Sequence, residues 1–427
     1  MTEPAREGSV PAPRPWVPAV LAGAAAFLCV SVAALALGIL EWVAAGRPFG
    51  IRLTWKLAGL YVGTFHGAGV EVRAGLPSSG ADVGVVNLSG LSTVHVTFLT
   101  GTILAGAVLW RAGRYVGRRA GDERRRRIAW GAAIAPAYGL LVLAAALLVR
   151  LSFPESGFTD VRVVAWQAFL GASLLAAAAG AAGAAGSAVG PVSRGEACLR
   201  GGWRMTVALV VCSFAGFLVV AGLRSDLSAA YVRGLTRAGS TGTVAAMHHV
   251  LLLPNQSFLI AAPAMGSCLR LDGSGSQPTT LCLRTITVRP GLGALLMPDH
   301  PEEPAAIPAP WLLFLVVPAV ATVWGGLAVG AGAGHAREGA VRGAGAGLVF
   351  AAAVMIGEAL AAIWITREES GTLVWFGGDL LRTGIVAIAW GVGGGVLGAL
   401  LGAGRQDPEG AVEADPPPPA PPSPTSL

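Results

Sequence analysis

Long apolar blocks constrain this chain more than any other feature of its sequence. Blocks of about 18 or more mostly apolar residues recur along its 427 residues, and a helix of that length crosses the hydrocarbon core of a bilayer. Only 13% of the residues are charged, against about 25% in a soluble domain. The sequence therefore predicts an all-α fold, a polytopic integral membrane helix bundle.

Eight blocks are candidate membrane spans. We expect them at about residues 16–44, 91–110, 128–149, 163–189, 205–223, 311–332, 344–365 and 382–403. The first block is too long for the apolar region of a signal peptide, so we expect it to be retained as a span. The ends, residues 1–15 and 404–427, are polar and Pro-rich, and we expect both tails to be disordered.

One arginine-rich loop, residues 111–127, predicts the orientation in the membrane. Short loops rich in arginine stay on the cytoplasmic side. By counting back, the N-terminus is also expected in the cytoplasm. Contact with anionic lipid head groups is a second possible use of the cluster. Its members are Arg111, Arg114, Arg118, Arg119, Arg124, Arg125, Arg126 and Arg127.

Two long polar segments, residues 46–88 and 266–309, are predicted outer loops. Both contain alternating apolar and polar residues around Gly/Pro/Ser turns, which predicts small extracytoplasmic β-hairpins. Cys268 and Cys282 flank the turn DGSGSQPTT of the second loop. In an oxidising exterior these two thiols would pair across the hairpin. Such a bridge would add about 3 kcal/mol to a small loop.

The apolar segment 243–265 is interrupted near its middle by Pro254, Asn255 and Gln256. If it crosses fully, the chain has nine spans and residues 266–309 lie in the cytoplasm. If it enters and returns as a re-entrant hairpin, the chain has eight spans and that loop lies outside. The short loop 333–343 carries Arg337 and Arg342, and short basic loops follow the positive-inside rule best. We therefore favour eight spans plus one re-entrant helical hairpin.

Few residues are candidates for chemistry. Glu358 lies in the block 344–365, and a carboxylate inside a span is costly, so by default it marks a functional site. Together with Pro254, Asn255 and Gln256 it forms our candidate intramembrane polar site. His248 and His249 precede the break, but adjacent helical residues point in different directions, which disfavours a shared metal ion.

Several classes of function have no support in the sequence. No zinc-ligand spacing, catalytic triad or Walker-type lysine is present, so we expect no metal, no cofactor and no enzyme activity. Because the arginines cluster beside apolar blocks, the formal charge of +6 does not predict nucleic-acid binding. No internal repeat is visible, so the repeat signature of many transporters is not found.

The stretch LLLPNQS, residues 251–257, supports a resemblance. With its outer hairpins and Arg-rich inner loops, the chain resembles uncharacterised polytopic membrane proteins of actinobacteria. It is distantly similar to a permease-like family associated with cell division, in which Leu-Pro-Asn occurs in a similar apolar context. The apolar blocks predict a place in the cell membrane, with the lipid bilayer as a partner, and the resemblance implies partners among envelope or division proteins. It leaves two hypotheses: a transporter, or a non-transporting envelope scaffold.

A membrane-impermeant thiol reagent, applied to intact cells with and without prior reduction, tests the position of residues 266–309. The eight-span arrangement predicts that Cys268 and Cys282 are labelled only after reduction, because they are then outside and paired. Cys198, in a predicted cytoplasmic loop, is the internal control that stays unlabelled. If Cys268 and Cys282 react only once the membrane is opened, the segment 243–265 is a full span.

Overall fold

The computed structural model describes most of the chain between residues 16 and 403. The residues outside the description are 1–15, 47–52, 75–81, 84–85, 88–89, 122, 154–157, 188–192, 224–232, 234–235, 237–238, 274–278, 283–313, 368–370 and 404–427. The two predicted disordered tails, most of the predicted outer loop 266–309 and parts of the predicted outer loop 46–88 lie there.

The chain divides into two compact units. Unit 1 comprises Met1–Pro191, Val210–Val317 and Val354–Val386, and unit 2 comprises Val192–Leu209, Pro318–Ala353 and Ala387–Leu427. Three long helices, α7 (Arg194–Leu223), α13 (Ala336–Ala361) and α14 (Leu380–Ala403), contribute residues to both units. Asn255, Ser267, Glu358 and Thr383, on which the candidate site depends, all belong to unit 1.

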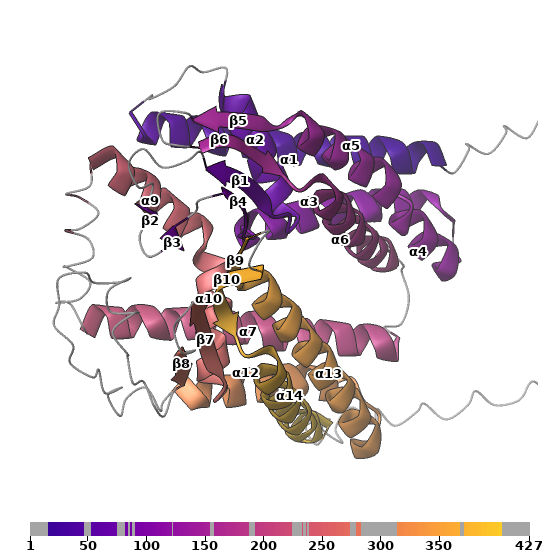
Figure 1. Cartoon of the computed structure of the whole chain (residues 1–427). Helices are drawn as coiled ribbons and strands as arrows, with labels where there is room; N and C mark the ends of the chain where they lie inside the picture. Colours follow the sequence, from indigo (N-terminus) through magenta and orange to yellow (C-terminus); the bar gives the residue numbers. More distant parts are fainter. Residues whose placement is uncertain are drawn as a thin grey trace, which may run out of the picture. The chain divides into compact units, whose positions relative to one another are not determined.

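The remaining helices of the described chain, which are labelled in Figure 1, lie in unit 1 except for most of α12. They are α1 (Trp16–Ala44), α2 (Thr54–Phe65), α3 (Leu99–Arg119), α4 (Arg124–Ala132), α5 (Ala135–Leu148), α6 (Ala165–Ala185), α9 (Gly239–Leu251), α10 (Leu253–Ala264) and α12 (Val316–Gly330).

Among the described residues, five helical segments are long and apolar enough to cross a membrane. They are α1, α4 with α5, α6, α13 and α14. The pair α9 and α10, bent by 62°, adds a sixth if it forms one span. The helical membrane class agrees with the sequence prediction, whereas the predicted count of eight spans is not supported by length and composition alone.

Several predicted boundaries were wrong where strands replace the ends of apolar blocks. Residues 91–95 of the block 91–110 belong to strand β4 (Gly90–His95), and residues 363–365 of the block 344–365 belong to strand β9 (Ile363–Arg367). The apolar and β-branched side chains of IWIT suit a half-buried strand as well as a span. The predicted arginine-rich loop is also mostly helical, since α3 continues to Arg119 and α4 begins at Arg124.

Eight of the described strands form one antiparallel sheet, so the description all-α is incomplete. Its order is β5-β6-β1-β4-β9-β10-β7-β8, and all eight strands lie in unit 1. Beyond β4 and β9 they are β1 (Val70–Ala74), β5 (Arg150–Phe153), β6 (Phe158–Val163), β7 (Cys268–Gly273), β8 (Thr279–Cys282) and β10 (Gly371–Gly378). A separate two-stranded hairpin joins β2 (Asp82–Val83) and β3 (Val86–Asn87).

The two faces of the sheet differ in polarity because successive side chains of a strand alternate. One face is apolar: Leu151 and Val161 pack with Leu57 of α2, and Leu269 and Phe376 pack near Leu259 of α10. The other face carries ion pairs, namely Arg162 with Glu71 at 2.6 Å, Arg150 with Asp160 at 2.9 Å and Arg270 with Asp272 at 2.7 Å. The sheet therefore covers helices of unit 1 with its apolar face.

The order of elements repeats once along the chain, a feature that the sequence did not reveal. The first series is α1, α2, β1, β4, α3, α4–α5, β5, β6 and α6. The second is α7, α10, β7, β8, α12, α13, β9, β10 and α14. Among the described elements, helix α9 and the small hairpin β2–β3 have no counterpart in the other series. In the sheet, each series contributes its strands in the same spatial order. Its later hairpin (β5–β6 or β9–β10) comes first, followed by its first strand (β1 or β7) and then its second strand (β4 or β8). No internal repeat is visible in the sequence, and the structure shows one at the level of topology.

Hydrogen bonds and strand registers place the two series in residue-level correspondence. After α2, the amide of Ala68 donates to Gly63 O, and after α10 the amide of Ser267 donates to Ala262 O. The helix ends share a left-handed glycine, Gly67 (φ 75°) and Gly266 (φ 90°), the usual residue at such a cap. Val70 pairs with Val163 as Leu269 pairs with Gly378. The repeat escaped detection because it preserves backbone geometry while the side chains differ.

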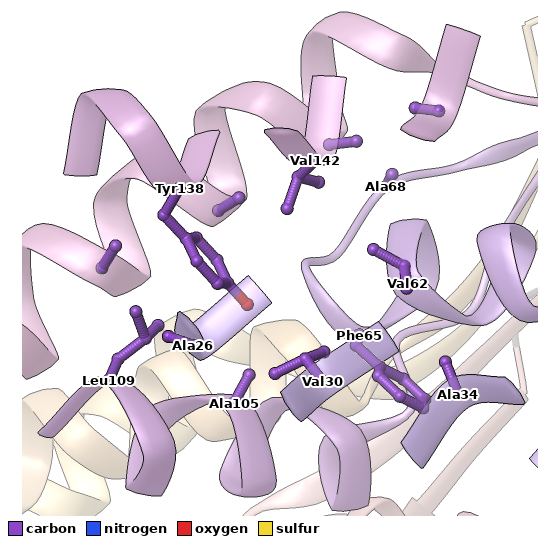
Figure 2. Close-up of a cluster of buried hydrophobic side chains, with 14 of the residues drawn as sticks. Ala26, Val30, Ala34, Val62, Phe65, Ala68, Ala105, Leu109, Tyr138 and Val142 are labelled. Carbon is purple, nitrogen blue, oxygen red and sulfur yellow. The ribbon is translucent and has the colours of Figure 1, made fainter. Parts of the chain in front are cut away.

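The main core of unit 1 lies between α1, α2, α3, α5 and α6. Figure 2 shows Tyr138, Leu109, Val30 and Phe65 within this cluster, and each is fully or almost fully buried. Alanines fill much of the remaining space, which lets the helices approach closely. At the contact between α3 and α6, Gly113 lies directly against the backbone of Gly180, with no room for a Cβ atom.

Replacing Gly113 by valine is expected to separate α3 from α6. Overpacking of this kind costs about 1–3 kcal/mol, so the midpoint of thermal unfolding in detergent should fall by several degrees. Gly106→Val is the matched control on the same helix, because a Cβ atom there meets only Leu175 at an ordinary 3.8 Å. Equal unfolding midpoints for the two variants would contradict the described packing.

Candidate functional site

Helix α10 connects the two polar features that the sequence singled out. It begins after Leu252, where the chain bends by 62° from α9, and it ends at Ala264 just before β7. Pro254 occupies the first turn of α10. A proline there loses no helical hydrogen bond, because the first N–H groups of a helix have no intrahelical partner. The proline thus starts a helix and does not interrupt one.

Asn255 joins α10 to the start of α3. Its side chain is 2% exposed, and both ends of its amide group are used. The Nδ2 group donates to Thr97 O at 2.6 Å, and Oδ1 accepts the amide N–H of Leu99 at 3.1 Å. On the other side of the break, the Thr100 hydroxyl donates to Leu251 O at 2.6 Å. These polar groups stabilise the bend from within unit 1.

A second cluster links α9 to α1 and α2. The Tyr61 hydroxyl donates to Glu41 Oε2 at 2.6 Å and lies 3.1 Å from His248 Nε2, which is 3.6 Å from Glu41 Oε1. Burial and the neighbouring Glu41 carboxylate raise the pKa of Tyr61, so the phenol keeps its proton. His249 lies 3.0 Å from Gln256 Nε2 in a separate, exposed contact.

Glu358 lies in a different place from the one we predicted. Because α13 ends at Ala361 and β9 follows, Glu358 is one turn from the end of the helix and not in the middle of a span. Its side chain is fully buried, and its carboxylate faces the backbone of Ala262 in α10 and of Gly378 in β10. Neither carboxylate oxygen has a hydrogen bond of standard geometry with the described residues.

Two buried hydroxyl groups accompany this carboxylate. Ser267, between α10 and β7, and Thr383, in the first turn of α14, lie with their side-chain oxygens 2.7 Å apart. Both residues are fully buried. A Cβ atom added at Gly378 would meet Glu358 Oε2 at 2.6 Å and Thr383 Oγ1 at 3.4 Å, so the carboxylate and the hydroxyl pair border the same glycine.

The residues of the predicted polar site lie at the two ends of α10. Asn255 and Ala262 are seven residues apart, about 10 Å along a helix, so Pro254, Asn255 and Gln256 do not surround Glu358. Sequence analysis missed Ser267 and Thr383. The only local signal was the serine after a helix-ending Met-Gly pair, and that signal is weak.

The cysteines and arginines of the prediction lie elsewhere. Cys268 is disulfide-bonded, and residue 282 is its neighbour in the register of β7 and β8. Cys29, Cys198 and Cys212 are free. At the junction of α3 and α4, guanidinium groups stack on aromatic rings: Arg114 on Trp110, Arg119 on Tyr115 and Arg126 on Trp130. Such stacking stabilises arginines beside apolar surface.

The polar face of the sheet carries a row of stacked rings. His95 of β4 stacks on Trp364 of β9 with ring centroids 4.5 Å apart, and Trp364 stacks on Trp375 of β10 at 5.4 Å. The three residues are cross-strand neighbours in the registers. Burial lowers the pKa of His95, so its ring is neutral at pH 7. The row crosses the junction of β4 with β9.

No group of three or more potential metal ligands occurs among the residues that the model describes. Searches against protein-family models, curated proteins and solved structures find no match to this chain.

Asn255→Ala is expected to destabilise the fold, because it leaves Leu99 N–H and Thr97 C=O buried without partners. Each unsatisfied group costs about 1–3 kcal/mol. The unfolding midpoint of the purified protein should fall by several degrees, whereas that of the neighbouring control Gln256→Ala should change little. A silent Asn255→Ala variant would mean that the bend does not depend on this amide.

Proposed function

We propose that this chain is an eight-span protein of the cell membrane that works as a non-transporting envelope scaffold. In this proposal the eight-stranded sheet lies on the extracytoplasmic side, and its polar face binds other envelope proteins. The observation that carries the proposal is the single sheet that contains strands from both series of elements.

The sheet supports eight spans over nine. In a nine-span chain, α9 and α10 form a full crossing, so β7, β8, β9 and β10 lie on the opposite side of the membrane from β1, β4, β5 and β6. Strand β4 nevertheless pairs with β9. Backbone groups in lipid must be satisfied within closed structures, so one open sheet does not extend through a bilayer. A re-entrant α9–α10 pair keeps all eight strands on one side.

The repeat supplies the eight helices. It matches α1 with α7, α3 with α12, α4–α5 with α13, and α6 with α14. Four crossings in each series return the chain to its starting side, with every hairpin on one side and the turn between α3 and α4 on the other. The arginines at that turn favour the cytoplasm. The disulfide-bonded Cys268 supports an oxidising environment for the strands.

The polar groups at the break favour a scaffold over a transporter. Asn255 and Thr100 use their side chains to hold α10 against α3. The polar side chains of an ion or substrate pathway, in contrast, face an open cavity or one another. Resemblance to a permease-like, division-associated family points to the same role, since it implies partners in the envelope.

The row of His95, Trp364 and Trp375 is the proposed centre of the binding surface. The three rings are partly exposed and lie where the two series of strands meet. Aromatic residues are enriched at the centres of protein interfaces because they bury large area at small entropic cost. Ion pairs on either side, such as Arg162–Glu71 and Arg270–Asp272, would form a polar rim.

Transport is the second candidate, and one observation favours it. Tandem repeats with a broken helix are common in transporters, and the buried carboxylate of Glu358 has no hydrogen-bond partner of standard geometry among the described residues. A transporter predicts that Glu358→Gln abolishes a flux while expression is maintained. The scaffold proposal predicts that partner binding survives this substitution.

A photo-crosslinking residue placed at Thr366, beside Trp364 on the polar face, tests the scaffold proposal in intact cells. We expect a discrete adduct with one envelope protein, and we expect Trp375→Ser to reduce its yield by at least about fivefold, the effect of losing about 1 kcal/mol at an interface. The same crosslinker at Leu28 of α1, which is 62% exposed, is the lipid-facing control. Adducts that do not differ between positions 366 and 28 would contradict the proposal.

A further inference from the structure

We propose that Glu358, Ser267 and Thr383 form a buried site for a small monovalent cation, a proton or a sodium ion. The site lies where α13 ends, where α10 passes into β7, and where α14 begins. All three residues belong to unit 1 and are fully buried. The proposal does not depend on the scaffold function.

The first series has a corresponding joint, the place where the end of α5, the turn from α2 to β1, the end of β6 and the start of α6 meet. This joint is lined by apolar side chains. The paired hydrogen bonds match Ser267 with Ala68, and the bonds Ala168 N to Val164 O and Thr383 N to Asp379 O match Thr383 with Ala168. The strand registers match Gly378 with Val163 and Ile363 with Leu151. Counting back five residues from the last pair matches Glu358 with Ala146.

The first series therefore closes this joint with Ala68, Ala146, Val163 and Ala168. All four are at most 4% exposed and belong to one hydrophobic cluster. Val163 also packs on Gly63 at the end of α2, where a Cβ atom would touch its side chain. The fold can thus be closed with apolar side chains at this place.

The second series changes all four positions together. Three of them gain oxygen atoms, as Ser267, Thr383 and Glu358, and the fourth loses its side chain, as Gly378. The loss is required, since a Cβ atom at residue 378 would lie 2.6 Å from Glu358 Oε2. A carboxylate and two hydroxyl groups are the oxygen ligands that hard cations such as sodium prefer. The coordinated change indicates a binding site and not a requirement of packing.

Electrostatics also call for a cation at Glu358. No ion pair to this carboxylate exists among the described residues, and a buried charge without a counter-charge is very costly. The charged groups considered on the elements that surround Glu358 contact other residues. Asp379 Oδ1 accepts from the amide of Arg382, Arg270 pairs with Asp272, and Cys268 is disulfide-bonded and does not titrate. A proton or a sodium ion would neutralise the carboxylate.

Thermal unfolding of the purified full chain tests the proposal. Midpoints are measured in sodium chloride and in choline chloride at equal ionic strength, across a range of pH. Sodium binding predicts a midpoint higher by about 3 °C or more in sodium chloride, because a ligand that binds only the folded state stabilises it. Proton binding predicts instead a pH-dependent midpoint without a sodium effect. In either case Glu358→Gln removes the dependence, and the matched surface control Asp272→Asn retains it.

A second pair of variants covers the case in which Glu358→Gln does not fold. Ser267→Ala with Thr383→Ala, and Glu358→Ala with Gly378→Val, each rebuild part of the apolar joint of the first series. Both are expected to fold and to lose the sodium or pH dependence. The proposal is overturned if the wild-type midpoint responds to neither cation, or if its response persists in these variants. Neither result bears on photo-crosslinking at Thr366, so the two proposals fail separately.

Discussion

The pairing of β4 with β9 is the contact on which the rest of the arrangement depends. It joins β4, the second strand of the first series, to β9, the first strand of the late hairpin in the second series, so eight short strands become one sheet. Because the backbone of an open sheet cannot be satisfied in lipid, this pairing restricts the paths that the helices between the strands can take. The bend at Leu252 and the return of α10 toward β7 follow from it in our proposal.

The repeat shows that the same backbone arrangement can hold apolar side chains in one series and polar side chains in the other. Both series end a short helix with a left-handed glycine and pass directly into a strand. In the first, the space around that turn is filled with alanine and valine, which contribute burial alone. In the second, the same space holds Glu358, Ser267 and Thr383. The apolar joint of the first series shows that the fold does not need polar groups at this place. The polar groups of the second series therefore call for another explanation, such as a binding site.

Local patterns predicted the candidate residues better than their grouping. Glu358 and Asn255 were recognised because polar groups in apolar blocks need partners, and both are indeed buried. The two residues lie at opposite ends of α10, and nothing in the sequence states that this helix separates them. Glu358 was expected in mid-span because IWIT reads as apolar sequence, and only its pairing with Ser92–His95 and β10 makes it a strand.

The sequence by itself determined the class of protein, since the length and spacing of apolar blocks depend only on local composition and on bilayer thickness. It also determined the positions along the chain of the arginine cluster and of the hairpin that Cys268 and Cys282 flank. The tertiary structure alone decided the joining of hairpins into one sheet, the repeat, and the cluster of Glu358 with Ser267 and Thr383. These features depend on contacts between segments that are distant in the sequence, such as the pairing of Val94 with Ile365 and the contact of Ser267 with Thr383 across 116 positions, and hydropathy carries no information about such pairs.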